Sequence, residues 1–150
     1  GDAYRADGDL EQAKAQYEKA IETEKRYPEA RLALARLHRQ RGDLPKALEE
    51  AERAAREYGE GAAGGPGAAQ AWVEMAEIEE ARGAASAAIS DHYIKALKAD
   101  ASCCQALWWL GKQAADRRLA EAKRLLGDYV ARCPKGAHAA EAAGLAARLR

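Results

Sequence analysis

The sequence predicts an all-α protein built as a stack of antiparallel helix hairpins, and three observations support this prediction. The first is composition, because 39 of the 150 residues are alanine, none is phenylalanine, and β-branched residues are scarce. Such a composition favours helices and argues against a β-sandwich or a β-barrel. The second is the recurrence of apolar residues three and four positions apart, which is typical of amphipathic helices. The third is an internal repeat.

The repeat is marked by turn signals at regular spacing. Gly8-Asp9-Leu10 recurs 34 residues later as Gly42-Asp43-Leu44. The third turn is at Gly83, and the fourth has Arg118 where the others have glycine. A small residue lies seven positions before each turn, where it would let the two helices of a hairpin approach closely. These small residues are Gly1, Ala35, Ala76 and Gly111.

The first half of the chain is predicted to form four helical segments. Residues 1–7 would be the tail of a helix that ends at Gly8, and this start inside a repeat suggests a piece of a longer solenoid. Residues 10–25 and 44–57 carry alanines in the same register, so both fit the second helix of a hairpin. Residues 29–41 follow a proline and have leucines at helical spacing, as the first helix of a hairpin requires.

The second half of the chain is predicted to form two more hairpins and a final helix. Each segment has apolar residues at helical spacing, and the last one is rich in alanine on one side and would cover the preceding hairpin. The expected helices are residues 68–82, 85–99, 103–115, 118–132 and 136–148.

Residues 1–150 are expected to form a single domain, because each hairpin needs its neighbours to bury its apolar face. Glycines gather in residues 59–67, between the second and third repeats. Without a preceding strand or a following Lys-Ser or Lys-Thr pair, they do not match a phosphate-binding loop. We therefore predict a flexible connecting loop there.

The repeat resembles the tetratricopeptide repeat family, whose unit has 34 residues. The resemblance covers essentially the whole chain and implies a right-handed superhelix of about four hairpins plus a C-terminal helix. It also implies protein binding without naming a partner, because the family binds many unrelated proteins. The matching residues are Gly1, Tyr4, Gly8, Asp9, Ala13, Tyr17 and Ala20 in the first unit, and Leu107, Leu110, Gly111, Ala122 and Pro134 in the fourth.

Charge and motifs argue against several classes of function. The 24 basic residues balance the 24 acidic ones, so no net field draws the whole molecule to nucleic acid or an anionic membrane. No stretch is long and apolar enough to insert into a membrane. His38, His92 and His138 lack metal-ligand spacing, and no catalytic or nucleotide-binding motif occurs. We expect no catalytic residue, metal, cofactor or small-molecule substrate.

Three cysteines, Cys103, Cys104 and Cys133, are an odd number without a paired short spacing. This pattern fits a reducing compartment, or incidental small apolar residues, better than a disulfide framework. We predict that all three cysteines are dispensable for folding and binding. The expected location is the cytoplasm, or the periplasm if the full-length chain carries a signal.

In the family, the first helix of each hairpin lines the concave face, and the resemblance implies which residues point into it. The implied groove is basic in its first half, acidic in its middle and aromatic at its far end. Alternatively, Arg36 and Arg39 simply pair with Glu77 and Glu80 of the next hairpin. The candidate partner-binding residues are Arg5, Arg36, Arg39, Gln40, Glu74, Glu77, Glu80, Trp108, Trp109 and Lys112.

The two neighbouring tryptophans, Trp108 and Trp109, point about 100° apart on a helix. At least one of them is therefore predicted to be an exposed interaction anchor rather than core. The Lys and Asn clamp with which some family members bind chaperone tails is absent from the corresponding positions. They carry Leu32, Arg36, Glu74, Gln105 and Trp109.

The sequence thus predicts a non-catalytic scaffold that binds a peptide, a helix or a folded protein on its concave face. The bias toward Ala, Arg and Gly suggests a GC-rich bacterial genome, where such arrays often serve envelope, pilus or motility machinery. Alternatives are an adaptor for a small regulatory GTPase, a self-assembling structural array, and an accessory domain of a larger enzyme. The partner's identity and the oligomeric state stay open.

Overall fold

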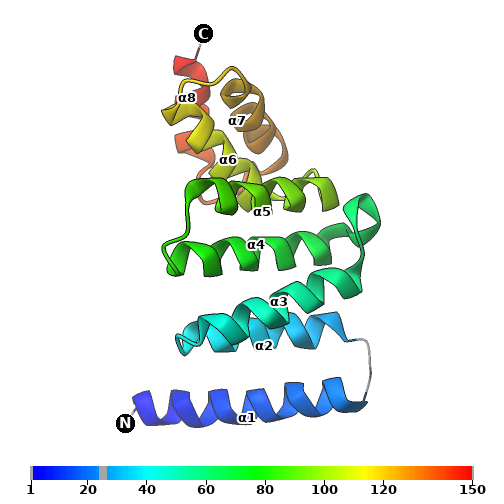
Figure 1. The fold of residues 1–150 in the computed structure, drawn as a ribbon. Helices are drawn as coiled ribbons and strands as arrows, with labels where there is room; N and C mark the ends of the chain where they lie inside the picture. Colours follow the sequence, from blue (N-terminus) through cyan, green and yellow to red (C-terminus); the bar gives the residue numbers. More distant parts are fainter. Residues whose placement is uncertain (1, 24–26, 150) are drawn as a thin grey trace.

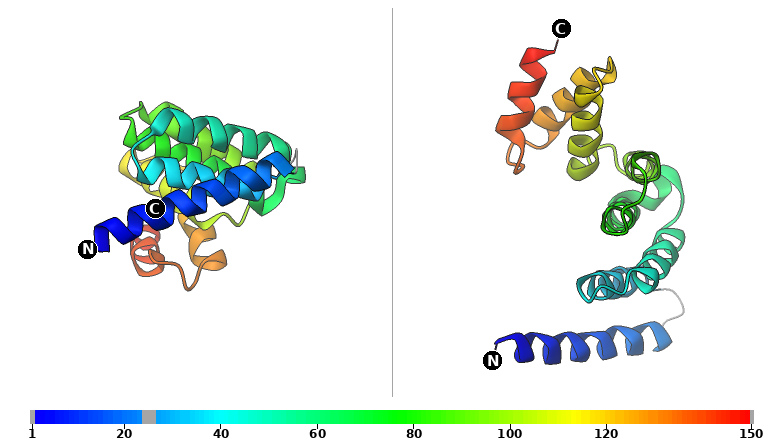
Figure 2. Two further views of the ribbon diagram at one scale, coloured as in Figure 1. Left: turned by 90° about the horizontal axis from the view of Figure 1, so that it is seen from below. Right: turned by 60° about the vertical axis from the view of Figure 1, so that its left-hand side comes forward.

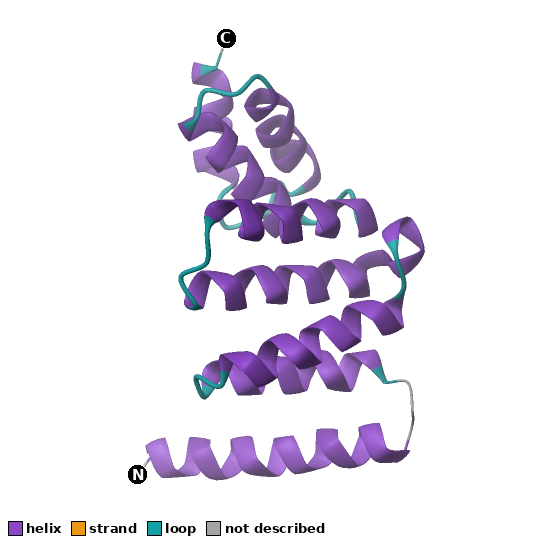
Figure 3. Cartoon of the chain, viewed as in Figure 1, coloured by secondary structure: helices purple, strands orange, loops and turns teal. Residues whose placement is uncertain are grey.

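The computed structural model describes residues 2–23 and 27–149, with side-chain surroundings from residue 8 onward, and the regular structure in these ranges is entirely helical (Figure 3). The fold class predicted from the sequence is therefore confirmed. The helices are α1 (Asp2–Thr23), α2 (Pro28–Gln40), α3 (Leu44–Tyr58), η1 (Gly61–Gly64), α4 (Gly65–Ala81), α5 (Ser86–Ala99), α6 (Cys104–Asp116), α7 (Glu121–Arg132) and α8 (Ala139–Arg148).

The helices stack in chain order as antiparallel hairpins (Figure 1). The hairpins are α2 with α3, α4 with α5, and α6 with α7, while α1 packs on α2 and α8 packs on α7. The stack is not uniform. In the right-hand view of Figure 2, α4 and α5 are seen nearly end-on, whereas α6 runs along the stack. The last three helices are therefore turned relative to the hairpin before them.

The core runs through the stack and is made largely of alanine. Ala35, Ala47 and Ala76 are fully buried between helices, because a methyl group lets two backbones approach closely. At Gly111, α6 lies even closer to α7, since a Cβ atom on this glycine would stand 2.9 Å from Cδ2 of Leu126. The predicted burial of the small residues seven positions before the second, third and fourth turns is confirmed. Gly1, before the first turn, lies outside the described residues.

The three described hairpin turns share one C-cap geometry. After α2, the N–H of Asp43 donates to the carbonyl oxygen of His38 at 2.8 Å, and Gly42 has a φ of 81°. Gly83 takes the same place after α4, and Arg118 takes it after α6 with a φ of 56°. This is the Schellman motif, in which the residue after the cap is left-handed. Arg118 adopts a conformation that glycine would adopt without steric cost.

The prediction of a turn at Gly8 is wrong, because α1 continues through it as one helix from Asp2 to Thr23. Gly8 lacks the positive φ of the later turn glycines. A glycine inside a helix costs only about 1 kcal/mol, so α1 accommodates Gly8. Three hairpins are therefore formed in the described chain, not four.

The glycine-rich segment, residues 59–67, contains helical structure and is not only a connecting loop. It contains η1, and α4 begins at Gly65 rather than at the predicted residue 68. A Cβ atom on Gly67 would overlap the ring of Tyr58, and one on Gly64 would overlap the carbonyl of Gly59. These two glycines permit close packing. The flexibility of residues 59–67 stays a prediction.

Replacing Arg118 with glycine is expected to stabilise the protein by about 1 kcal/mol, because glycine removes the steric cost of the left-handed conformation. The matched control is Gly83→Ala at the equivalent turn, which should destabilise by a similar amount. Urea unfolding followed by circular dichroism measures both. A destabilised Arg118→Gly variant would contradict this account of the turn.

Candidate functional site

All but one of the predicted binding residues lie on α2, α4 and α6, the first helices of the three hairpins. Arg36, Arg39 and Gln40 lie on α2, the three glutamates on α4, and the two tryptophans and Lys112 on α6. Arg5 lies in α1, but its side chain is outside the described residues. We call the surface formed by α2, α4 and α6 the first-helix face; it corresponds to the predicted concave groove.

The basic and acidic parts of this face neutralise each other. Glu74 receives Arg39 at 2.5 Å and Arg36 at 3.5 Å, and Arg39 also reaches Glu77 at 3.0 Å. The alternative prediction of pairing between the hairpins is therefore confirmed for Arg39 with Glu77. Glu74 is the main partner, however, and its carboxylate is almost fully buried at 3% exposure. Glu80 remains exposed.

Burial and charge act in opposite directions on the ionisation of this cluster. Burial lowers the pKa of Arg39, but the hydrogen bond that Arg39 donates to Glu74 and the charges of Glu74 and Glu77 outweigh it and raise that pKa. Burial also raises the pKa of Glu77, and the neighbouring Glu74 raises it further, against the opposing effect of Arg39. Glu77 pairs with one arginine, whereas Glu74 pairs with two. A cation from a binding partner would therefore stabilise the charge of the Glu77 carboxylate.

A pocket of about 320 Å³ lies at the far end of the first-helix face. Glu77 lines it together with four aromatic side chains from α5, α6 and α7. The pocket therefore joins a carboxylate to an aromatic wall. Its lining residues are Glu77, Tyr93, Cys104, Gln105, Trp108, Trp109, Tyr129, Gly136, Ala137 and His138.

Both tryptophans contribute to this wall, and each is half-buried. Trp108 stacks on His138 with ring centroids 4.3 Å apart and planes 5° apart. Trp109 stacks on Tyr93 at 4.9 Å, and the Lys112 ammonium lies 5.6 Å from the Trp108 ring centre. Both rings are held in place and still partly accessible, and the prediction that at least one of them is an interaction anchor stays a prediction. Rings fixed in this way lose little entropy when a partner binds.

Cys104 lines the same pocket and forms a disulfide with Cys133, with their Cα atoms 6.1 Å apart. The expectation that the cysteines form no disulfide is therefore wrong. Cys104 begins α6 and Cys133 follows α7, and both stand 14 or 15 residues from Arg118, so the antiparallel hairpin brings them together. Cys103 is the free thiol; it is buried, and burial raises its pKa.

Other site classes lack support in the described part of the chain. No group of three His, Cys, Asp or Glu residues there is placed to hold a metal ion. His38 is buried in α2, and His92 stacks on Trp72 with centroids 5.9 Å apart, so both have packing roles. No described helix has the length and apolar character needed to cross a membrane.

Reducing the disulfide is expected to destabilise the protein by about 3 kcal/mol, because the cross-link closes a loop with a sequence separation of 29 residues. This replaces the prediction that the cysteines are dispensable. Urea unfolding with and without dithiothreitol measures the effect, and the double variant Cys104→Ala, Cys133→Ala should not respond to the reductant. Equal midpoints for the wild type in both conditions would contradict the prediction.

Removing the partners of Glu74 is expected to cost more than removing Glu74. The double variant Arg36→Ala, Arg39→Ala should lose about 3 kcal/mol, because a buried carboxylate is left unpaired. Adding Glu74→Met to that variant should recover most of the loss. Urea unfolding of the two variants tests this, and a triple variant less stable than the double one would contradict it.

Comparisons with known proteins agree with the hairpin architecture. Residues 4–64 match the family model for the tetratricopeptide repeat. The fold is similar to the crystal structure of MamA, with 19% identity, a TM-score of 0.64, and coverage of 97% of this chain and 81% of that one. It is also similar to the crystal structure of YrrB, described as a TPR protein with an unusual peptide-binding site, with 18% identity and a TM-score of 0.63.

The YrrB match covers 97% of this chain and 71% of that one. The comparison with curated proteins gives no significant match. The repeat sequence is recognised in the first part of the chain, and the fold of the solved structures extends over nearly all of it. Residues 4–64 therefore match the tetratricopeptide repeat by sequence, and nearly the whole chain has the fold of the similar solved structures.

Proposed function

We propose that this chain is a non-catalytic scaffold that binds a segment of a partner protein in the pocket between Glu77 and the two tryptophans. The observation that carries the proposal is that one pocket contains two partly accessible tryptophan rings and the Glu77 carboxylate, whose charge is only partly balanced by arginine. An aliphatic or aromatic side chain would fill the space beside Trp108 and Trp109. A lysine or arginine close to it in the partner would face Glu77.

The charge arrangement narrows the chemistry of the partner. Arg36 and Arg39 are already paired with Glu74 and Glu77, so the first half of the face offers little to an acidic segment. Glu80 is exposed near the pocket side of α4 and adds negative charge. A basic segment followed by an apolar anchor therefore fits this face better than an acidic one.

The family and one structural relative support a binding role. Tetratricopeptide repeat domains generally mediate binding to proteins or peptides, and the YrrB structure is described as having an unusual peptide-binding site. With 18% identity, that structure supports the fold of this chain directly. The binding mode proposed for this chain depends on its own pocket residues.

The disulfide bears on where the scaffold acts. Disulfides persist in oxidising compartments and are rare in the cytosol. The bond between Cys104 and Cys133 therefore favours the periplasmic alternative over the cytoplasmic one. A periplasmic scaffold agrees with a role in envelope assembly, pilus or motility machinery, and it argues against recruitment of a cytosolic GTPase.

Truncating Trp108 is expected to weaken binding by at least tenfold and to act mainly on dissociation, because an aromatic anchor at the centre of a pocket carries much of the binding energy. A random-peptide display selection on the oxidised chain supplies the ligands, with calorimetry on the enriched peptides. The enriched sequences should combine an aromatic or aliphatic residue with a nearby lysine or arginine.

The matched control is Trp72→Ala, which truncates a half-buried tryptophan outside the pocket. It should retain the affinity, provided that circular dichroism shows unchanged helicity in both variants. Enrichment of acidic peptides, or equal losses in the two variants, would contradict the proposed site.

A further inference from the structure

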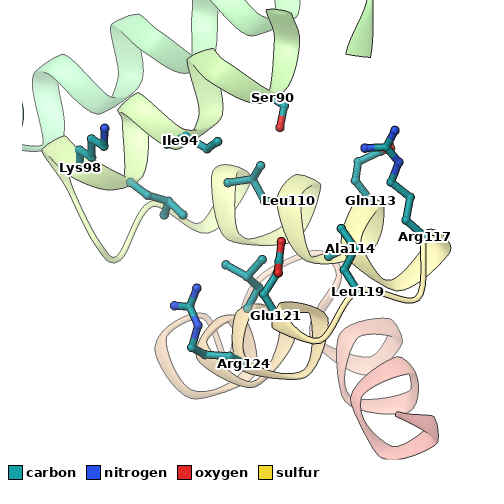
Figure 4. Close-up of a pocket in the computed structure, with 12 residues that line it drawn as sticks. Ser90, Ile94, Lys98, Leu110, Gln113, Ala114, Arg117, Leu119, Glu121 and Arg124 are labelled. Carbon is teal, nitrogen blue, oxygen red and sulfur yellow. The ribbon is translucent and has the colours of Figure 1, made fainter. Parts of the chain in front are cut away.

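A second groove, of about 470 Å³, lies between α5, α6 and α7 (Figure 4). Ser90, Ile94 and Lys98 line it from α5, with Leu110 on α6 and Leu125 on α7. The groove and the tryptophan pocket are both lined from α5, α6 and α7, but they have no lining residue in common. It lies at the place where the last three helices turn relative to α4 and α5.

The groove carries unusually exposed apolar side chains. Ile94 and Leu119 are each 43% exposed, and no other large hydrophobic side chain in the described chain is classed as exposed. In Figure 4 they lie on either side of Leu110, which is half-buried and also lines the groove. Two exposed aliphatic residues across one hollow are an arrangement that a partner would cover.

Positive charge stands at both ends of the groove. Lys98 and Arg124 lie at one end and Arg117 at the other (Figure 4). Lys98 and Arg117 are exposed and form no ion pair within the described residues, whereas Arg124 lies 4.0 Å from Asp128. Glu121 lies between the two ends, so the rim as a whole remains basic.

We infer that this groove binds an amphipathic helix of a partner protein, with aliphatic residues on one face and acidic residues beside them. Such a helix would place its apolar face on Ile94, Leu110 and Leu119, and its carboxylates at Lys98 and Arg117. The wall from Ser90 to Lys98 is about 12 Å long, which matches two turns of a docked helix. A second copy of the groove would bring like charges together, so it fits less well.

Two synthetic 18-residue peptides test the inference. Both have leucines at helical spacing on one face; one has glutamates beside them and the other has lysines. Fluorescence anisotropy at low salt should show at least tenfold tighter binding of the glutamate peptide. Ile94→Ser with Leu119→Ser should abolish that binding, and Lys98→Glu with Arg117→Glu should reverse the preference between the peptides.

Trp108→Ala is the matched control, because it alters the tryptophan pocket and leaves this groove intact. It should keep the affinity for the glutamate peptide, which separates failure of this inference from failure of the proposed function. Equal binding of both peptides, binding of neither, or loss only on Trp108→Ala would overturn the inference. Binding to anionic lipid vesicles that depends on Ile94 and Lys98, without peptide binding, would assign the groove to membranes and would also overturn it.

Discussion

The close approach of paired helices at small residues is the constraint on which the rest of the structure depends. Ala35 and Ala76 have no exposed surface, and a methyl group at Gly111 would force the side chain of Leu126 to shift. Because each contact sits seven residues before a turn with the same Schellman geometry, every hairpin has the same internal register. That register decides which side chains of the first helices remain outside the core.

The side chains left outside the core take two different roles along the stack. Between α2 and α4, charges join the hairpins, and the buried carboxylate of Glu74 depends on Arg36 and Arg39 for its compensation. Between α4 and α6, no such network fills the face, and aromatic rings line a pocket instead. Equivalent positions on the first helices thus join the hairpins in the first half of the stack and line a pocket in the second.

The sequence predicts what depends on local pattern and repeat register, and it misses what depends on contacts between distant segments. The positions of most helices and the burial of Ala35 and Ala76 follow from periodicity. The continuity of α1 through Gly8 does not, because Gly8 stays inside a helix although the same Gly-Asp-Leu sequence forms a turn at Gly42. The disulfide was missed because a spacing of 29 residues looks unpaired until the hairpin is folded about Arg118.

Both candidate binding surfaces lie where the regularity of the stack is broken. The last hairpin has an arginine in place of the turn glycine, a glycine in place of the buried alanine, and a disulfide across its open end. Helix α6 presents Trp108 and Trp109 to one hollow and Leu110 to another. Regular stacking would bury such side chains against the next hairpin, so the turn of α6–α8 is what leaves them accessible. The disulfide joins the start of α6 to the end of α7 and holds Cys104 in the pocket wall, which suits the proposed binding.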